Sequence, residues 1–185
     1  TTIITGASRG LGLATARELA RSGSRTVIVA GHNMQRLGGA AASLARDCDG
    51  PVVPMLLDLA SLESVRKFVS EFASQSFPPL TGLVCNAGVS LDSAEHRSAD
   101  GYELTFAVNH LGHFLLTAVL MESLRRSGNG RVITVSSSVH RQARGDGRWQ
   151  LSRQGYDRNE AYAKSKLANV LFASELARKN QGRGV

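Results

Sequence analysis

Short apolar runs alternate with helical patterns along most of this chain, and this alternation limits its fold more than any other feature. Five runs are continuously apolar, as in strands covered on both faces of a parallel sheet: Thr2–Thr5, Arg25–Ala30, Val52–Leu57, Leu80–Cys85 and Arg131–Ser136. Helical patterns lie between them at Leu11–Arg21, Met34–Arg46, Leu62–Ser74 and Leu111–Leu124, with Ser61 as a plausible N-cap. The order predicts a doubly wound α/β fold with a mostly parallel sheet and helices on both faces.

The chain is long enough for one sizeable core, with 185 residues of which 42% are hydrophobic, and nothing in it indicates a second domain. We therefore expect a single domain over residues 1–185. The chain opens directly on the apolar run at Thr1 and stops at Val185, where another strand could begin. These ends predict truncation on both sides, with the C-terminal strands of the sheet missing.

Composition excludes several classes of protein. Cys48 and Cys85 are far apart in the sequence, which predicts neither a disulfide framework nor a zinc site and favours a reducing, cytoplasmic setting. The net charge of +7 comes from scattered basic residues without interleaved aromatic residues, so we expect no nucleic-acid partner. His110, His113 and His140 lack carboxylate or cysteine companions at suitable spacing, so we expect no metal.

A glycine-rich turn, TGASRGLG at Thr5–Gly12, joins the first apolar run to the first helical pattern. Unpaired amide groups and the positive dipole end of a helix attract an anion such as a pyrophosphate, and glycines let it approach closely. The spacing differs from G-x-G-x-x-G, and an ordinary glycine-rich turn is the alternative. A phosphate-binding NTPase is disfavoured, because the lysine and hydroxyl pair of a P-loop is missing.

Tyr162 and Lys166 are four residues apart, so a helix would place both on one face. A free phenol has a pKa near ~10, and a neighbouring ammonium can help it work as a base near neutrality. At about 4 Å this attraction is only ~1 kcal/mol in water but ~4 kcal/mol at an effective dielectric of ~20, so the pair needs a partly dry cleft. Taken alone, such a pair more often means a half-buried ring and a solvated amine.

Five motifs in order together resemble the short-chain dehydrogenase/reductases: TGASRGLG at Thr5–Gly12, CNAG at Cys85–Gly88, Asn109, Ser137, and YAKSK at 162–166. The segments at 108–116 and 162–172 are similar to the retinol-dehydrogenase-like branch of that family, as is the wide gap between Ser137 and Tyr162. The resemblance implies a Rossmann-type fold and an NAD(P)-dependent oxidoreductase that acts on CH–OH and C=O groups.

The resemblance also implies catalytic roles. Tyr162 would be the acid/base, Lys166 would lower its pKa and bind the nicotinamide ribose, Ser137 would polarise the substrate oxygen, and Asn109 would support a water-linked proton relay. Three serines stand together at 136–138, and the family pattern favours Ser137. An asparagine inside an apolar helix could instead satisfy local backbone groups.

The same resemblance implies a cofactor-binding set. Its members are Gly6, Ser8, Arg9, Gly10, Leu11, Gly12, His32, Asn33, Asp58, Leu59, Asn86, Ala87 and Gly88, together with Tyr162 and Lys166. No acidic residue ends the second strand, so nothing there repels a 2′-phosphate, and Arg9 and Arg36 supply positive charge. NADP is therefore preferred, and NAD stays an alternative. Asp58 could equally be a turn or helix-cap residue.

The expected partner is a small-molecule carbonyl or alcohol substrate. Leu111–Leu124 is apolar nearly all round, which predicts cover by the sheet, by a neighbouring helix and by a second subunit, and hence a homodimer or homotetramer. Membrane association outside these residues is undetermined. The competing function is a catalytically silent dinucleotide-binding regulator or scaffold, because a fold guarantees no activity. The intact set of Asn109, Ser137, Tyr162 and Lys166 argues against it.

Overall fold

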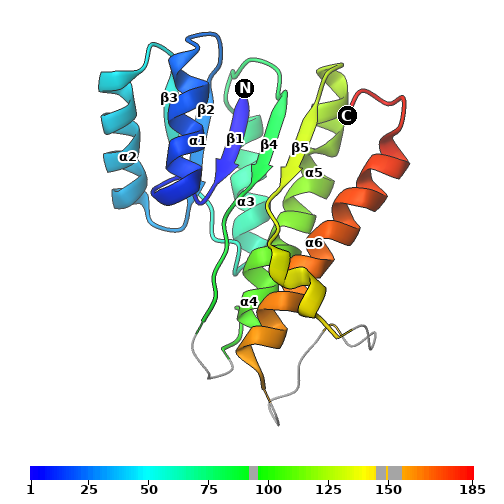
Figure 1. Ribbon diagram of the computed structural model, residues 1–185. Coiled ribbons are helices and arrows are strands. Elements are labelled where there is room, and N and C mark those ends of the chain that lie inside the picture. Colours follow the sequence, from blue (N-terminus) through cyan, green and yellow to red (C-terminus); the bar gives the residue numbers. More distant parts are fainter. Residues whose placement is uncertain (92–95, 145–148, 150–155) are drawn as a thin grey trace.

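The computed structural model describes residues 1–91, 96–144, 149 and 156–185, and its centre is one parallel sheet (Figure 1). The sheet order is β3-β2-β1-β4-β5, and every neighbouring pair is parallel. The strands are β1 (Thr2–Thr5), β2 (Val27–Gly31), β3 (Val52–Leu56), β4 (Gly82–Cys85) and β5 (Arg131–Thr134). The order reverses between β1 and β4, which in a doubly wound sheet creates a crevice at the carboxyl ends of the strands.

Helices cover both faces of this sheet (Figure 1). The exception is β5, which was predicted to be covered on both faces but exposes Arg131 and Ile133. The helical elements are α1 (Gly10–Arg21), α2 (Met34–Asp47), α3 (Leu62–Ala73), α4 (Leu104–Phe106), the π-helical η1 (Ala107–Leu111), α5 (Gly112–Arg126), the 3₁₀-helical η2 (Ser138–Gln142) and α6 (Arg158–Asn180). Successive strand residues face opposite sides, so Ile4 packs with α1 and α2, whereas Ile3 packs with α3 and α5. The doubly wound architecture is confirmed.

The predicted helix over Leu111–Leu124 corresponds to α5 and contributes Leu116, Leu120 and Leu124 to the core. With α4 and η1 it forms a continuous helical stretch, Leu104–Arg126, whose mean hydropathy of 1.5 and length would by themselves allow a membrane span. However, 56% of its apolar window is buried inside the fold, so it serves here as a core helix.

Candidate functional site

A cleft of about 470 Å³ lies at the carboxyl ends of β1, β2, β3 and β4, around the point where the strand order reverses. Its lining contains thirteen residues that the sequence predicted for cofactor binding: Gly6, Ser8, Arg9, Gly10, Leu11, Gly12, His32, Asn33, Asp58, Leu59, Asn86, Ala87 and Gly88. Segments far apart in the sequence thus form one concave surface.

The glycine turn packs closely against the cleft wall at 86–88. Gly6 has a φ of +67°, and a Cβ there would lie 2.8 Å from Ala87 Cα, so a side chain is excluded by conformation and by space. A Cβ on Gly12 would lie 2.6 Å from Asn86 Nδ2. Arg9, the N-cap of α1, makes no side-chain cap, so its side chain does not compete for the first amide groups of the helix. This cradle fits the pyrophosphate of a dinucleotide.

Thr5 and Asn86 hold the two loops of the crevice together. The Thr5 hydroxyl accepts hydrogen bonds from the backbone N–H groups of Asn86 at 3.0 Å and Ala87 at 2.9 Å. Asn86 Nδ2 in turn donates to the Thr5 carbonyl at 2.8 Å. The wall at 86–88 is therefore fixed to the end of β1.

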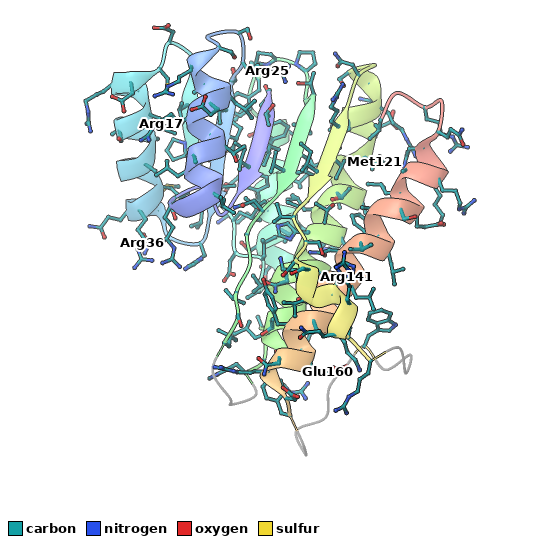
Figure 2. All side chains as sticks on the ribbon, in the orientation of Figure 1. Arg17, Arg25, Arg36, Met121, Arg141 and Glu160 are labelled. Carbon is teal, nitrogen blue, oxygen red and sulfur yellow. The ribbon has the colours of Figure 1, made fainter. Side chains whose placement is uncertain are left out.

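Positive and polar groups gather where β2 ends. Arg36 lies on the first turn of α2, and Figure 2 shows it at the carboxyl-end side of the sheet, opposite to Arg25. Asn33 lines the cleft, but its side chain also caps α2 by accepting a hydrogen bond from Arg36 N at 2.9 Å. Asp58 also lines the cleft, and its Oδ1 accepts a hydrogen bond from Ala60 N at 2.9 Å, as the turn interpretation expected.

Tyr162 and Lys166 lie on one face of α6, as their spacing predicted. Lys166 Nζ is 5.6 Å from the centroid of the Tyr162 ring and donates to the Val135 carbonyl at 3.2 Å. A Cβ on Gly88 would be 3.5 Å from Lys166 Nζ, so the ammonium lies next to Gly88 of the cleft wall. Burial lowers the pKa of Lys166 from its ordinary value.

Asn109 lies in the π-helical segment and ties the cleft wall to α6. Its Oδ1 accepts from Val89 N at 2.7 Å, and its Nδ2 donates to Val89 O and to Ser165 Oγ, each at 3.0 Å. The Val89 N–H can only donate and its C=O can only accept, so the orientation of the amide is fixed. The Asn109 carbonyl accepts from Asn169 Nδ2 at 3.1 Å and faces His113 Nδ1 at 3.2 Å.

The three serines after β5 have different partners. Ser136 Oγ donates to the Lys166 carbonyl at 2.8 Å and is therefore engaged with the α6 backbone. Ser137 caps η2, and its Oγ accepts a longer hydrogen bond from Val139 N at 3.3 Å. Ser138 begins η2. The cap leaves the hydroxyl proton of Ser137 for another acceptor, since the hydroxyl acts there only as an acceptor.

Sequence reasoning did not assign two buried polar residues to the site, Thr5 and His113. Thr5 is fully buried at the end of β1, and its Oγ1 is 2.7 Å from His113 Nε2. Thr5 directly precedes the glycine turn, and His113 follows Asn109 by one helical turn, but only the tertiary structure pairs the two. Arg36, noted for its charge alone, also lines the cleft.

Comparisons with known proteins agree with this geometry. A sequence model described as short chain dehydrogenase matches residues 1–185. Retinol dehydrogenase 14 of Mus musculus is 41% identical over all of this chain and 58% of its own length. Retinol dehydrogenase 12 of Homo sapiens is 42% identical over 99% of this chain and 57% of its own length. The chain thus spans less than three fifths of these relatives.

Among solved structures, a short chain dehydrogenase from Escherichia coli CFT073 complexed with NADPH aligns with a TM-score of 0.79 and 29% identity. The alignment covers 98% of this chain and 72% of that one. Together, the family match over the whole chain and the curated relatives show that this chain belongs to the short-chain dehydrogenase/reductase family, in its retinol-dehydrogenase-like branch.

Proposed function

We propose that this chain forms the dinucleotide-binding and catalytic part of an oxidoreductase that transfers a hydride between a nicotinamide and a carbonyl or alcohol carbon. The observation that carries the proposal is the position of Lys166, whose Nζ lies near both the Tyr162 ring and Gly88 of the cleft. When bound, NADPH would supply the hydride that converts a carbonyl to an alcohol.

Tyr162 is the acid/base in this proposal. In the reductive direction its phenol gives a proton to the substrate oxygen as the carbon receives the hydride, which leaves a phenolate. The Lys166 ammonium stabilises that phenolate, and its place next to Gly88 of the cleft also suits a contact with the nicotinamide ribose.

Ser137 and Asn109 have supporting roles. Ser137 donates to the substrate oxygen as negative charge develops, because Ser136 is engaged with the Lys166 carbonyl while Ser137 makes only a long cap interaction. Asn109 supports the proton path from Lys166, because its amide holds both Val89 of the cleft wall and Ser165 of α6 in place.

NADP is the preferred cofactor in this proposal, and NAD is the less favoured alternative. The cleft beyond β2 contains His32, Asn33 and Arg36 and no carboxylate next to them in sequence, so a 2′-phosphate would meet positive charge there. Asp58, which also lines the cleft, follows β3 instead. The E. coli relative whose structure holds NADPH is consistent with this preference.

The proposal also includes an oligomeric assembly and a cellular setting. Exposed apolar residues gather on the adjacent helices α5 and α6, at Phe114, Val119, Val170 and Leu171. We propose that they form the interface of a homodimer, or part of a homotetramer.

We propose a cytoplasmic setting because Cys48 and Cys85 are both free.

The test is an NADPH-consumption screen of the purified protein with retinaldehyde, steroid and small aromatic carbonyl compounds. We expect oxidation of NADPH with at least one of them, and weaker use of NADH. The competing function, a dinucleotide-binding regulator, predicts tight NADPH binding by calorimetry without any consumption across the panel.

A further inference from the structure

We propose that His113 is a positioning residue that couples the cofactor cleft to the reaction centre, through Thr5 on one side and the Asn109 backbone on the other. Its imidazole is 2% exposed and lies between the end of β1 and the π-helical segment. The proposal rests on the proposed function, because it concerns how the two halves of that site are held together.

The donor and the acceptor in each hydrogen bond of His113, with Asn109 and with Thr5, follow by elimination. The Asn109 carbonyl can only accept, so His113 Nδ1 must carry the proton that it shares with this oxygen at 3.2 Å. Burial, opposed in part by this hydrogen bond, lowers the pKa of His113 to about 4, so the ring is neutral near pH 7. A neutral ring protonated at Nδ1 has a bare Nε2, which therefore accepts a hydrogen bond from the Thr5 hydroxyl at 2.7 Å.

The Thr5 hydroxyl is consequently aligned for its contacts with the cleft wall. With its proton directed to His113, its two lone pairs accept the amides of Asn86 and Ala87. The Val84 carbonyl lies farther away, at 3.3 Å, and is the weaker acceptor for the same proton. His113 thus determines how firmly the loop at 86–88 is held.

The other side of the imidazole acts on the reaction centre. Asn109 has its carbonyl held by His113 and Asn169, and its amide held by Val89 and Ser165. Ser165 Oγ donates onward to the Tyr162 carbonyl at 2.7 Å. A shift of the Asn109 backbone would therefore move its contacts with Val89 of the cleft wall and with Ser165 and Asn169 of α6, the helix that carries Tyr162 and Lys166.

Two substitutions of His113 separate its hydrogen bond with Thr5 from its hydrogen bond with Asn109. His113→Asn keeps an amide donor near the Nδ1 position and removes the acceptor for Thr5, whereas His113→Gln keeps an acceptor near the Nε2 position and removes the donor for Asn109. We expect His113→Gln to lower kcat by about tenfold or more while the NADPH Kd stays within about twofold. His113→Asn should retain most of the kcat.

A second pair tests the Thr5 side without relying on turnover. Thr5→Val removes the acceptor of two buried amides, so we expect the NADPH Kd to rise about tenfold and hydrogen exchange at 85–89 to accelerate. Thr5→Ser keeps the hydroxyl and should restore both values. These readouts remain decisive if a histidine variant folds poorly.

The control is Thr117→Val, one turn after His113 on α5. The Thr117 hydroxyl is fully buried, and its hydrogen-bond partner among the described residues is Cys85 Sγ, at 3.8 Å. This variant therefore perturbs the same helix without removing a hydrogen bond of Thr5, His113 or Asn109. It should change neither kcat nor the NADPH Kd.

Equal losses of kcat in both histidine variants, or Thr5→Val values equal to those of the control, would overturn the proposal. A wild-type protein that binds NADPH but consumes none would instead reject the proposed function and leave the exchange test to decide the role of Thr5 and His113.

Discussion

At the scale of single residues, we expect His113 to make the stability of the fold depend on pH. Burial lowers its pKa from an ordinary 6.5 to about 4, with further lowering by the charges of Lys166 and His110. Between these values the unfolded chain binds a proton that the folded chain excludes, so stability falls as the pH drops from about 6.5 to about 4. We expect unfolding in urea to show ~2 kcal/mol less stability at pH 5 than at pH 7.5 from this group alone. His113→Gln should lose that part of the pH dependence. An unchanged pH dependence in the variant would show that the His113 pKa does not differ between the folded and unfolded chain.

Gly12 gives a second prediction at this scale. A Cβ at this position would lie 2.6 Å from both Asn86 Nδ2 and the Gly6 carbonyl, so Gly12→Ala must distort the cradle. We expect the NADPH Kd to rise by at least about tenfold, measured by titration calorimetry. The matched control is Gly39→Ala in α2, where a Cβ meets nothing within 4 Å. It should raise stability by ~0.5–1 kcal/mol and keep the affinity, because alanine favours a helix over glycine. Equal affinity in both variants would contradict the assignment of Gly12 to the cofactor cradle.

Several site residues could be predicted singly from the sequence, whereas their partners could not. Asn109 stands out because an amide inside an apolar helix is unusual, and it does satisfy backbone groups, but those of Val89 rather than local helical ones. Thr5 resembles any strand residue, and His113 any histidine in a core helix. Their pairing depends on packing between β1 and α5, which no local pattern encodes.

At the scale of elements, the predicted N-cap of α3 at Ser61 is confirmed. Ser61 accepts a hydrogen bond from Ser64 N at 3.2 Å and satisfies one free amide of the first turn. Ser61→Ala should therefore cost ~1 kcal/mol of stability in urea unfolding, with the NADPH Kd unchanged. Ser70→Ala on the exposed face of the same helix should be neutral or slightly stabilising. If Ser70→Ala lost as much stability as Ser61→Ala, the result would argue against a stabilising cap at Ser61.

Strands and amphipathic helices were predictable because apolar periodicity records which face is buried. The predicted helix at Met34–Arg46 differs from α2 by one residue, and the predicted strand at Val52–Leu57 differs from β3 by one. The π-helical segment Ala107–Leu111 and the η2 turn were not predicted. The π-helical segment arises where side-chain contacts of Asn109 to other elements override local helix geometry. The η2 turn instead begins with a local cap, in which Val139 N donates to Ser137 Oγ.

At the scale of the whole molecule, the proposed homodimer depends on the apolar surface of α5 and α6. Leu171 is 50% exposed there, so Leu171→Glu would place a charge in the proposed interface. We expect sedimentation velocity to show a dimer or tetramer for the wild-type protein and a shift to monomer for the variant. Met34→Glu is the control, because Met34 is 47% exposed at the start of α2, an element that covers the other face of the sheet. A monomeric wild-type protein, or equal assembly of both variants, would reject this interface.

The most direct measurement is turnover by Tyr162→Phe, with NADPH affinity measured on the same sample. The substitution removes one hydroxyl from the α6 face that holds Lys166 and leaves the glycine cradle untouched. We expect near-complete loss of NADPH consumption, with the NADPH Kd within about threefold of wild type, because the hydroxyl transfers the proton and contributes little to binding. Turnover equal to that of the wild-type protein would show that Tyr162 is not the proton donor.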